Sequence, residues 1–171
     1  EKPLPLRARD WLSLGSPGTV SPANSFLRLS GSRRSIALTG LVAGRFGSKW
    51  IASYPDNPHL GLPRASATIS LNDPETGRVS SVVEGSIVSA ERTAASAAVA
   101  AIALYEGREP PREVALVGFG PINRAALRHL REVFPGIREL AIADPALHAS
   151  GKLSEAFLDA TGDSGLRLVV L

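Results

Sequence analysis

Cysteine is absent from this sequence of 171 residues, and aromatic residues make up only 5% of it. Without cysteine the chain has no disulfide bond, no thiolate nucleophile and no thiolate metal ligand, which is typical of cytoplasmic proteins. The three histidines, His59, His129 and His148, are too widely separated in the sequence to form a metal-binding motif. We therefore predict a cytoplasmic protein without a metal site.

Methionine is also absent, so we expect the natural protein to begin before this sequence does. The apolar run at 166–171 resembles a strand that is cut midway. These two features predict that the sequence is part of a longer protein.

Charge and apolar character are not concentrated in any one segment. The net charge is +3, and the 19 basic residues are scattered, which argues against a nucleic-acid partner. No apolar stretch approaches the length of a membrane span, and no signal peptide is recognisable, so we expect no membrane partner. Only three basic residues are lysines, which makes Lys49, inside an apolar segment, conspicuous.

The first part of the chain is typical of strands followed by one helix. Residues 1–24 are rich in Pro, Ser and Gly, which indicates a loop. Alternating patterns then predict strands, and Asx, Pro and Gly residues at 72–77 predict a hairpin turn in which Asp73 and Glu75 have no catalytic role. The predicted strands are 26–29, 35–38, 49–53, 65–71 and 79–83. A helix of small residues is expected from Ser89 or Ala90 to about Tyr105, before a linker at 106–111.

The apolar run that breaks at Gly118-Phe119-Gly120 is the most informative motif. Val114 to Val117 is typical of a strand that is buried on both faces of a parallel sheet. Gly118 permits a tight turn, and Gly120 removes the Cβ that would hold a pyrophosphate away from the backbone. Pro121 suits the first position of a helix whose N-terminal amides, including those of Ile122 and Asn123, would face the phosphates. Because Gly-x-Gly alone is weak evidence, a tight turn in an arbitrary α/β domain is the alternative.

A second apolar strand, 140–144, ends on Asp144, which lies 24 residues after Gly120. A carboxylate at about this spacing meets the adenosine ribose hydroxyls and favours NAD over NADP, because it repels a 2′-phosphate. Asn123 replaces the third glycine of the motif, so we expect the helix and the strand to pack slightly farther apart. A helix near 153–160 and a strand near 166–171 would complete one half of a doubly wound sheet.

Four segments and the glycine turn together resemble the ornithine cyclodeaminase/mu-crystallin family; the segments are Gly47–Ser53, Asn57–Pro63, Leu71–Gly77 and Ser89–Ser96. Within that family, the segment Glu84–Ala90 is most similar to siderophore-pathway dehydrogenases. These enzymes oxidise N-(2-amino-2-carboxyethyl)-L-glutamate to 2,3-diaminopropionate and 2-oxoglutarate. The resemblance implies a homodimer, a small amino-acid substrate and a catalytic aspartate beyond Leu171.

The resemblance also implies roles for four side chains. Arg28 is expected to bind the substrate α-carboxylate with its planar guanidinium, although a surface arginine on an edge strand has the same pattern. Lys49 matches the family lysine beside the substrate, which binds a carboxylate or moves a proton. Arg92 matches an arginine that faces both substrate and cofactor, and Thr93 is expected to bond a phosphate. A cation at a helix N-terminus is unfavourable unless an anion faces it, which supports this role for Arg92.

We therefore predict an α/β protein with an α+β substrate-binding and dimerisation domain at 1–110 and a partial Rossmann domain, half of a doubly wound parallel sheet, at 111–171. The predicted activity is NAD-dependent oxidation at a C–N bond of an amino acid or amino-acid-derived secondary amine. Redox-neutral cyclodeamination of ornithine and NAD-dependent ligand binding without catalysis are the alternatives. The predicted NAD-binding residues are Arg92, Thr93, Gly118, Gly120, Pro121, Ile122, Asn123 and Asp144.

Overall fold

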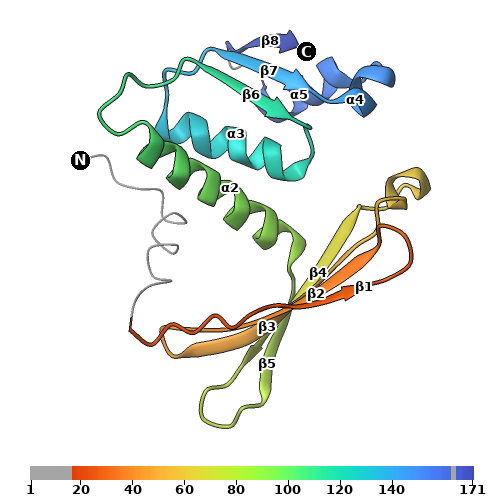
Figure 1. The fold of residues 1–171 in the computed structure, drawn as a ribbon, viewed down its shortest axis with the longest axis vertical. Coiled ribbons are helices and arrows are strands. Elements are labelled where there is room, and N and C mark those ends of the chain that lie inside the picture. The colour runs from red at the N-terminus through yellow and green to blue at the C-terminus, as the bar shows by residue number, and fades with distance from the viewer. Residues whose placement is uncertain (1–16, 163–164) are drawn as a thin grey trace. The chain divides into compact units, whose positions relative to one another are not determined.

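The computed structural model describes residues 17–162 and 165–171, which divide into two compact units (Figure 1). The first unit extends to Ser89, and the second begins at Ala90, within helix α2 (Ser86–Leu104). Most of the loop expected at 1–24 lies outside the described residues. The predicted domain limits, 1–110 and 111–171, lie later in the chain than this division and stay a prediction.

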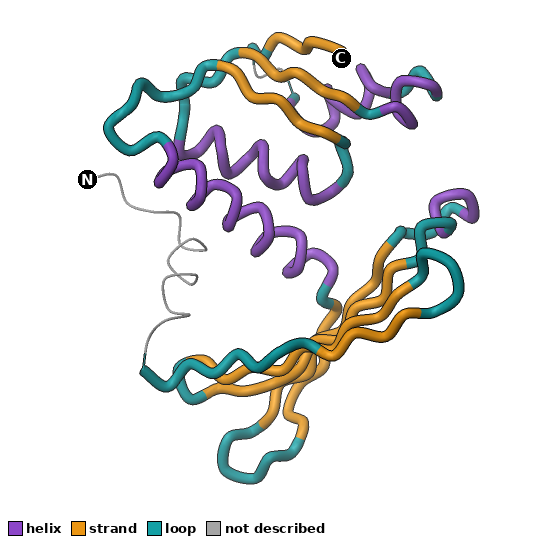
Figure 2. The backbone as a smooth tube through the Cα atoms, viewed as in Figure 1, coloured by secondary structure: helices purple, strands orange, loops and turns teal. Residues whose placement is uncertain are grey.

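The first unit is a five-stranded antiparallel sheet in the order β1-β2-β3-β4-β5 (Figure 2). Its strands are β1 (Ser25–Arg28), β2 (Arg34–Val42), β3 (Arg45–Ser53), β4 (Ala65–Asn72) and β5 (Val79–Glu84). All five predicted strands are confirmed. However, β2 and β3 extend four residues further at the ends that face each other, where Gly40 and Gly47 interrupt the alternation. A short 3-10 helix, η2 (Asn57–Leu60), was not predicted from the sequence.

Gly47 allows β3 and β4 to approach each other closely. A Cβ built on Gly47 would lie 2.2 Å from the carbonyl oxygen of Ser70, a contact that no real side chain makes. The paired residue on β2, Gly40, has its nearest neighbour, the carbonyl oxygen of Val20, at an ordinary 3.6 Å. The glycine of the Gly47–Ser53 segment is therefore required by packing within the sheet.

The turn between β4 and β5 is confirmed. One carboxylate oxygen of Asp73 accepts hydrogen bonds from the backbone N–H of Glu75 and from the N–H and hydroxyl of Thr76. The hydrogen bond from the Thr76 hydroxyl is the largest cause that lowers the pKa of Asp73. Gly77 closes the turn with a left-handed φ of +70°.

Helix α2 begins at Ser86, three or four residues before the predicted start at Ser89 or Ala90. The Glu84 carboxylate accepts the N–H groups of Ser86 and Ile87 at 2.6 and 3.5 Å, which satisfies two amides of the first turn. Against the sequence expectation, α2 is long and apolar enough to cross a membrane by length and composition alone, and no other helix among the described residues is. Its buried alanines, Ala94, Ala95 and Ala98, are those of a packing helix.

The second unit contains a three-stranded parallel sheet in the order β6-β7-β8. Its strands and helices are β6 (Glu113–Val117), α3 (Pro121–Val133), β7 (Glu139–Ala143), α4 (Pro145–Ala149), α5 (Leu153–Thr161) and β8 (Arg167–Val170). One core cluster contains residues of the strands, of α3 and of α5, namely Leu116, Phe119, Leu127, Leu140, Ile142, Leu153, Ala156 and Phe157. Both helices therefore cover the same face of the sheet, and the predicted half of a doubly wound sheet is confirmed.

The prediction that the first parallel strand is buried on both faces was wrong for the described residues. Leu116 of β6 is buried in the core, whereas its neighbour Val117 is 87% exposed. Successive residues of a strand point to opposite faces, and the helices of this unit cover only one of them. Helix α4 was also missed, because five residues are too few to show a helical period.

Replacing Gly47 should destabilise the first unit far more than replacing its partner. We expect Gly47→Ala to lower the free energy of unfolding by about 1–3 kcal/mol, the usual cost of overpacking. Gly40→Ala, the matched control, should be neutral or slightly stabilising, because its Cβ meets no close contact. Urea denaturation of both variants measures the difference, and equal losses would contradict the close-approach explanation.

Candidate functional site

The glycine turn joins β6 to α3 and is bonded to the end of β7. The N–H of Gly118 donates to the carbonyl oxygen of Ala143 at 2.8 Å, and Gly118 has a left-handed φ of +81°. Gly120 precedes α3 with an extended backbone and contributes no side-chain cap, and Pro121 has no N–H. The amides of Ile122 and Asn123 have no intrahelical partner at this position, which makes the turn suitable for an anion.

The two glycines of the turn are glycines for different reasons. Gly118 needs a left-handed conformation, which other residues rarely adopt. Gly120 has an ordinary φ of −76°, and a Cβ built on it would meet no atom of the described residues within 4 Å. Inside the described chain only the N-cap position favours glycine at 120, and it favours Asn, Asp or Ser as much or more, whereas a pyrophosphate that must approach the backbone requires glycine.

Asn123 ties the first turn of α3 to the end of β6. Its side-chain amide donates to the carbonyl oxygens of Val117 and Gly118 at 2.9 and 2.8 Å. These hydrogen bonds fix the turn. The slightly larger distance between helix and strand that Asn123 led us to expect stays a prediction.

Asp144 follows β7 directly and lies beside the glycine turn. One carboxylate oxygen accepts the N–H of Leu147 at 3.0 Å, and the other accepts the N–H of Phe119 at 2.7 Å. The Leu147 hydrogen bond is the largest cause that holds the pKa of Asp144 below its ordinary 3.8, and the Phe119 hydrogen bond adds to it. The carboxylate is therefore ionised at neutral pH, and each oxygen retains capacity to accept a further hydroxyl.

Arg124 stabilises the same turn and was missed by the sequence analysis. The Arg124 Nε donates to the carbonyl oxygen of Phe119 at 3.0 Å, and the guanidinium lies 5.2 Å from the centre of the Phe119 ring. The guanidinium also pairs with the carboxylate of Asp159 at 3.1 Å. The Phe119 side chain is 1% exposed and belongs to the core. The residue between the two glycines is thus held by the core on one side and by Arg124 on the other.

Lys49 lies on β3 of the first unit, among apolar neighbours. It is half-buried between Leu38 on β2 and Ile69 on β4, and its Nζ donates to the hydroxyl of buried Ser89 at 3.1 Å. Trp50 points to the opposite face and is 52% exposed, because successive strand residues alternate. The stem of Lys49 therefore does not lie along the Trp50 ring.

Arg28 faces the same side of the sheet as Lys49. The register aligns Phe26 with Ile36 and Ile51, two residues from Lys49 on β3, so Phe26, Arg28 and Lys49 share one face. The Arg28 guanidinium lies 5.3 Å from the centre of the Phe26 ring. Arg28 is exposed on an edge strand, so its predicted contact with a substrate carboxylate stays a prediction.

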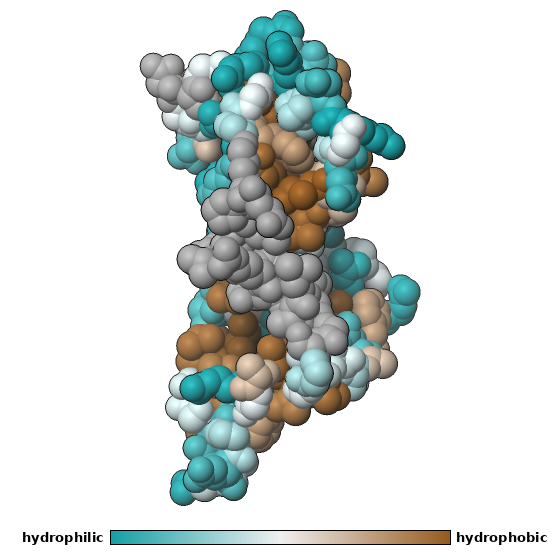
Figure 3. All heavy atoms as spheres, turned by 90° about the vertical axis from the view of Figure 1, so that its left-hand side faces the viewer, coloured by the Kyte–Doolittle hydropathy of each residue, from teal (hydrophilic) through white to brown (hydrophobic). Residues whose placement is uncertain are grey.

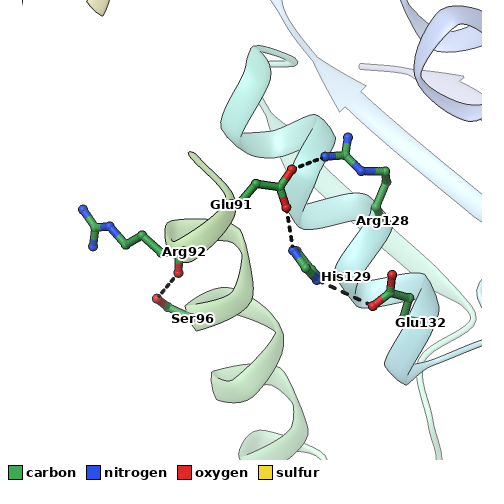
Figure 4. Close-up of polar contacts among 6 residues, drawn as sticks. All are labelled: Glu91, Arg92, Ser96, Arg128, His129 and Glu132. Atoms are coloured by element: carbon green, nitrogen blue, oxygen red, sulfur yellow. Dashed lines mark hydrogen bonds and ion pairs between the residues drawn. The ribbon is translucent and has the colours of Figure 1, made fainter. Parts of the chain in front are cut away.

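Arg92 and Thr93 lie in α2 within the second unit, and Arg92 is exposed. Their neighbour Glu91 reaches α3, where its carboxylate binds Arg128 and His129 (Figure 4). The predicted convergence of Arg92 with Lys49 on one substrate stays a prediction. No group of three metal-binding side chains is found within 17–162 and 165–171.

The model of the ornithine cyclodeaminase/mu-crystallin family matches residues 33–163, which include the Lys49 strand, helix α2 and the glycine turn. The chain belongs to this family.

Several members of the family with assigned activities are similar to the chain. The N-((2S)-2-amino-2-carboxyethyl)-L-glutamate dehydrogenase of Staphylococcus aureus is 34% identical over 134 residues, which are 73% of this chain and 39% of that protein. The alanine dehydrogenase of Archaeoglobus fulgidus is 35% identical over 98 residues, 57% of this chain and 30% of that protein.

A solved structure of an archaeal alanine dehydrogenase dimer with bound NAD aligns with a TM-score of 0.74 at 27% identity. The alignment covers 96% of this chain and 48% of that one. The Δ1-pyrroline-2-carboxylate reductase of Thermococcus litoralis shares the fold, with a TM-score of 0.79 at 24% identity over 96% of this chain and 50% of that one. This chain thus spans about half of these solved structures and 39% of the S. aureus enzyme.

Substituting the two turn glycines should separate folding from ligand binding. We expect Gly118→Ala to destabilise the protein by about 1 kcal/mol or more, because alanine is strained at a left-handed φ. Gly120→Ala should lower the free energy of unfolding by only about 0.5–1 kcal/mol, because alanine is a poorer N-cap than glycine. It should weaken NADH binding at least about tenfold, because the new methyl group occupies the phosphate position. Fluorescence titration with NADH and urea denaturation measure the two effects, and an unchanged NADH affinity of Gly120→Ala would refute a phosphate site at this turn.

Proposed function

We propose that the protein is an NAD-dependent oxidoreductase that acts on N-(2-amino-2-carboxyethyl)-L-glutamate and releases 2,3-diaminopropionate and 2-oxoglutarate. The observation that supports this most directly is the turn at 118–120, where no contact within the described chain requires glycine at position 120 and the ionised Asp144 lies alongside. The similarity to the S. aureus dehydrogenase supports the choice of substrate.

In this proposal NAD lies against the glycine turn. The amides of Ile122 and Asn123 bind its pyrophosphate, Asp144 accepts the ribose hydroxyls, and Arg92 and Thr93 approach the phosphates. When bound, NAD supplies a hydride acceptor for the substrate carbon that bears the secondary amine. The anchored Phe119 keeps this turn in one conformation, so the binding amides do not have to be ordered when the cofactor arrives.

The substrate-binding residues match the charge of the proposed substrate. N-(2-amino-2-carboxyethyl)-L-glutamate carries three carboxylates, and the candidate residues Arg28, Lys49 and Arg92 supply three cationic side chains. Lys49 is held by Ser89 within an apolar part of the sheet, which suits a lysine that must present its amine at a fixed point. Oxidation converts the C–N bond to an imine, and water then cleaves the imine to the amine and the 2-oxo acid.

We also propose that the protein is a cytoplasmic homodimer. Its interface would be the face of the five-stranded sheet that is opposite to Lys49. Leu27, Trp50 and Val82 share that face by register, and each is more than half exposed. Figure 3 shows that apolar side chains, coloured brown, are exposed on the face of the protein that it draws. Exposed apolar surface of this kind is typical of an interface, and the archaeal alanine dehydrogenase structure is a dimer.

The cofactor preference should depend on Asp144. We expect the wild-type protein to bind NADH at least about tenfold more tightly than NADPH, because the carboxylate repels the 2′-phosphate. Asp144→Ala should reduce this preference. Asp144→Asn, which keeps an oxygen to accept the Leu147 N–H, separates loss of charge from loss of the helix cap. Equal affinity of the wild type for both cofactors, measured by titration, would refute the assignment.

The products of the reaction should identify the activity. We expect the full-length protein, given N-(2-amino-2-carboxyethyl)-L-glutamate and NAD, to produce NADH and 2-oxoglutarate in equal amounts. Lys49→Ala should lower turnover by about a hundredfold or more and leave NADH affinity within about twofold, because the lysine acts at the substrate. Ammonia and proline from ornithine without net NADH would indicate a cyclodeaminase instead. NADH binding without turnover of any amino acid would indicate a ligand-binding protein.

A further inference from the structure

Helices α2 and α3 pack through very small side chains. Ala94 of α2 forms a buried cluster with Ala125 and Ala126 of α3, and Ala95 and Ala98 of α2 are also buried. On α2, positions 91, 94, 95 and 98 follow the helical spacing that places residues on one face. Glu91 is thus the one charged residue in an otherwise alanine stripe.

Glu91 joins α2 to α3 through both of its carboxylate oxygens. Oε1 accepts from Nη2 of Arg128 at 2.5 Å, and Oε2 lies 3.0 Å from Nε2 of His129 (Figure 4). The Glu91 side chain is 19% exposed and that of His129 is 8% exposed, so water screens the His129 contact weakly. The other ring nitrogen of His129 lies 3.7 Å from the carboxylate of Glu132.

This cluster supplies the directional contact that the alanine stripe lacks. Methyl groups present a smooth surface, along which one helix can slide or rotate against another at small cost in packing. A buried polar pair keeps its hydrogen bond only over a narrow range of helix positions, and fixing the register of helices is the best-attested use of such pairs. A slip of α2 by one turn would move its residues by about 5.4 Å along its axis.

We infer that Glu91 is a positioning residue that sets Arg92 and Thr93 for the cofactor. Arg92 and Thr93 follow Glu91 directly in α2. Glu91 binds two side chains of α3, and α3 begins at the glycine turn. By fixing α2 against α3, the Glu91 cluster fixes both side chains relative to the phosphate-binding amides. The inference rests on the proposed function, because it requires NAD at that turn.

A double-mutant cycle on the full-length protein tests this role. Glu91→Ala, Arg92→Ala and the double variant are titrated with NADH, and their unfolding in urea is measured. We expect Glu91→Ala to raise the Kd for NADH about tenfold, the loss of about one charge-assisted contact. In the Arg92→Ala background the same change should raise Kd by no more than about twofold, because the residue that Glu91 positions is already gone.

Two further variants make the result specific. Glu132→Ala removes the other carboxylate beside His129 and keeps the Glu91 contacts, so its Kd for NADH should stay within about twofold of wild type. Glu91→Gln retains an oxygen that accepts from Arg128 or His129, so it should recover part of the lost affinity; it also replaces Glu91→Ala in the cycle if the alanine variant does not fold.

The outcomes separate the inference from the function on which it rests. A wild type that does not bind NADH would overturn both. The wild type could bind NADH while the Glu91 variants lose stability but keep the wild-type Kd for NADH. This result would show that the cluster only stabilises the fold, and it would overturn the inference alone. Fully additive effects of Glu91→Ala and Arg92→Ala on Kd would also overturn it, because Glu91 would then act independently of Arg92.

Discussion

The attachment of the glycine turn to the end of β7 is the constraint on which the arrangement of the second unit depends. Two consecutive amides, those of Gly118 and Phe119, donate to the carbonyl of Ala143 and the carboxylate of Asp144. These bonds place the turn, the start of α3 and the acid at one edge of the parallel sheet. If the turn moved, the first amides of α3 and the carboxylate of Asp144 would no longer lie close together.

The same contacts, with those of Leu147 and Arg124, hold the turn in one conformation before any ligand binds. Asp144 also caps α4 through Leu147, so one carboxylate fixes a helix and a loop at once. Phe119 fills the core beneath the turn, and Arg124 covers its ring and bonds its carbonyl. A ligand that bound here would meet donors and an acceptor already in place, which lowers the entropic cost of binding.

The elements with a local cause could be predicted from the sequence. The turn at Asp73, the strand before Gly118 and the helix after Pro121 each depend on residues a few positions apart, so propensity and spacing identify them. Helix α4 was not predicted, because its five residues show no helical period. The early start of α2 was not predicted either, because its first amides bond the side chain of Glu84 rather than a recognised capping residue.

Contacts between residues that are distant in the sequence could not be predicted in the same way, although one such pair left a recognisable pattern. Arg124 and Asp159 are 35 residues apart, and nothing in the periodicity links them. Glu91 and His129, 38 residues apart, each stand on the apolar face of a helix. A polar side chain on a buried face needs a partner, so two such residues on neighbouring helices are candidates for one another. That criterion names the pair but not its geometry.

The glycines show how a motif in the sequence gains a definite physical meaning only from the structure. Gly47 and Gly118 look like members of one family pattern, yet the backbone explains both without any ligand: one avoids the Ser70 carbonyl, and the other adopts a left-handed turn. Gly120 satisfies neither explanation, since its φ is ordinary and the space beside it is open. Gly136, after the end of α3, shares these two properties, so they point to a ligand only together with the position of Gly120 between β6 and the first amides of α3. For this reason Gly120, rather than the whole Gly-x-Gly pattern, is the residue that argues for a bound phosphate.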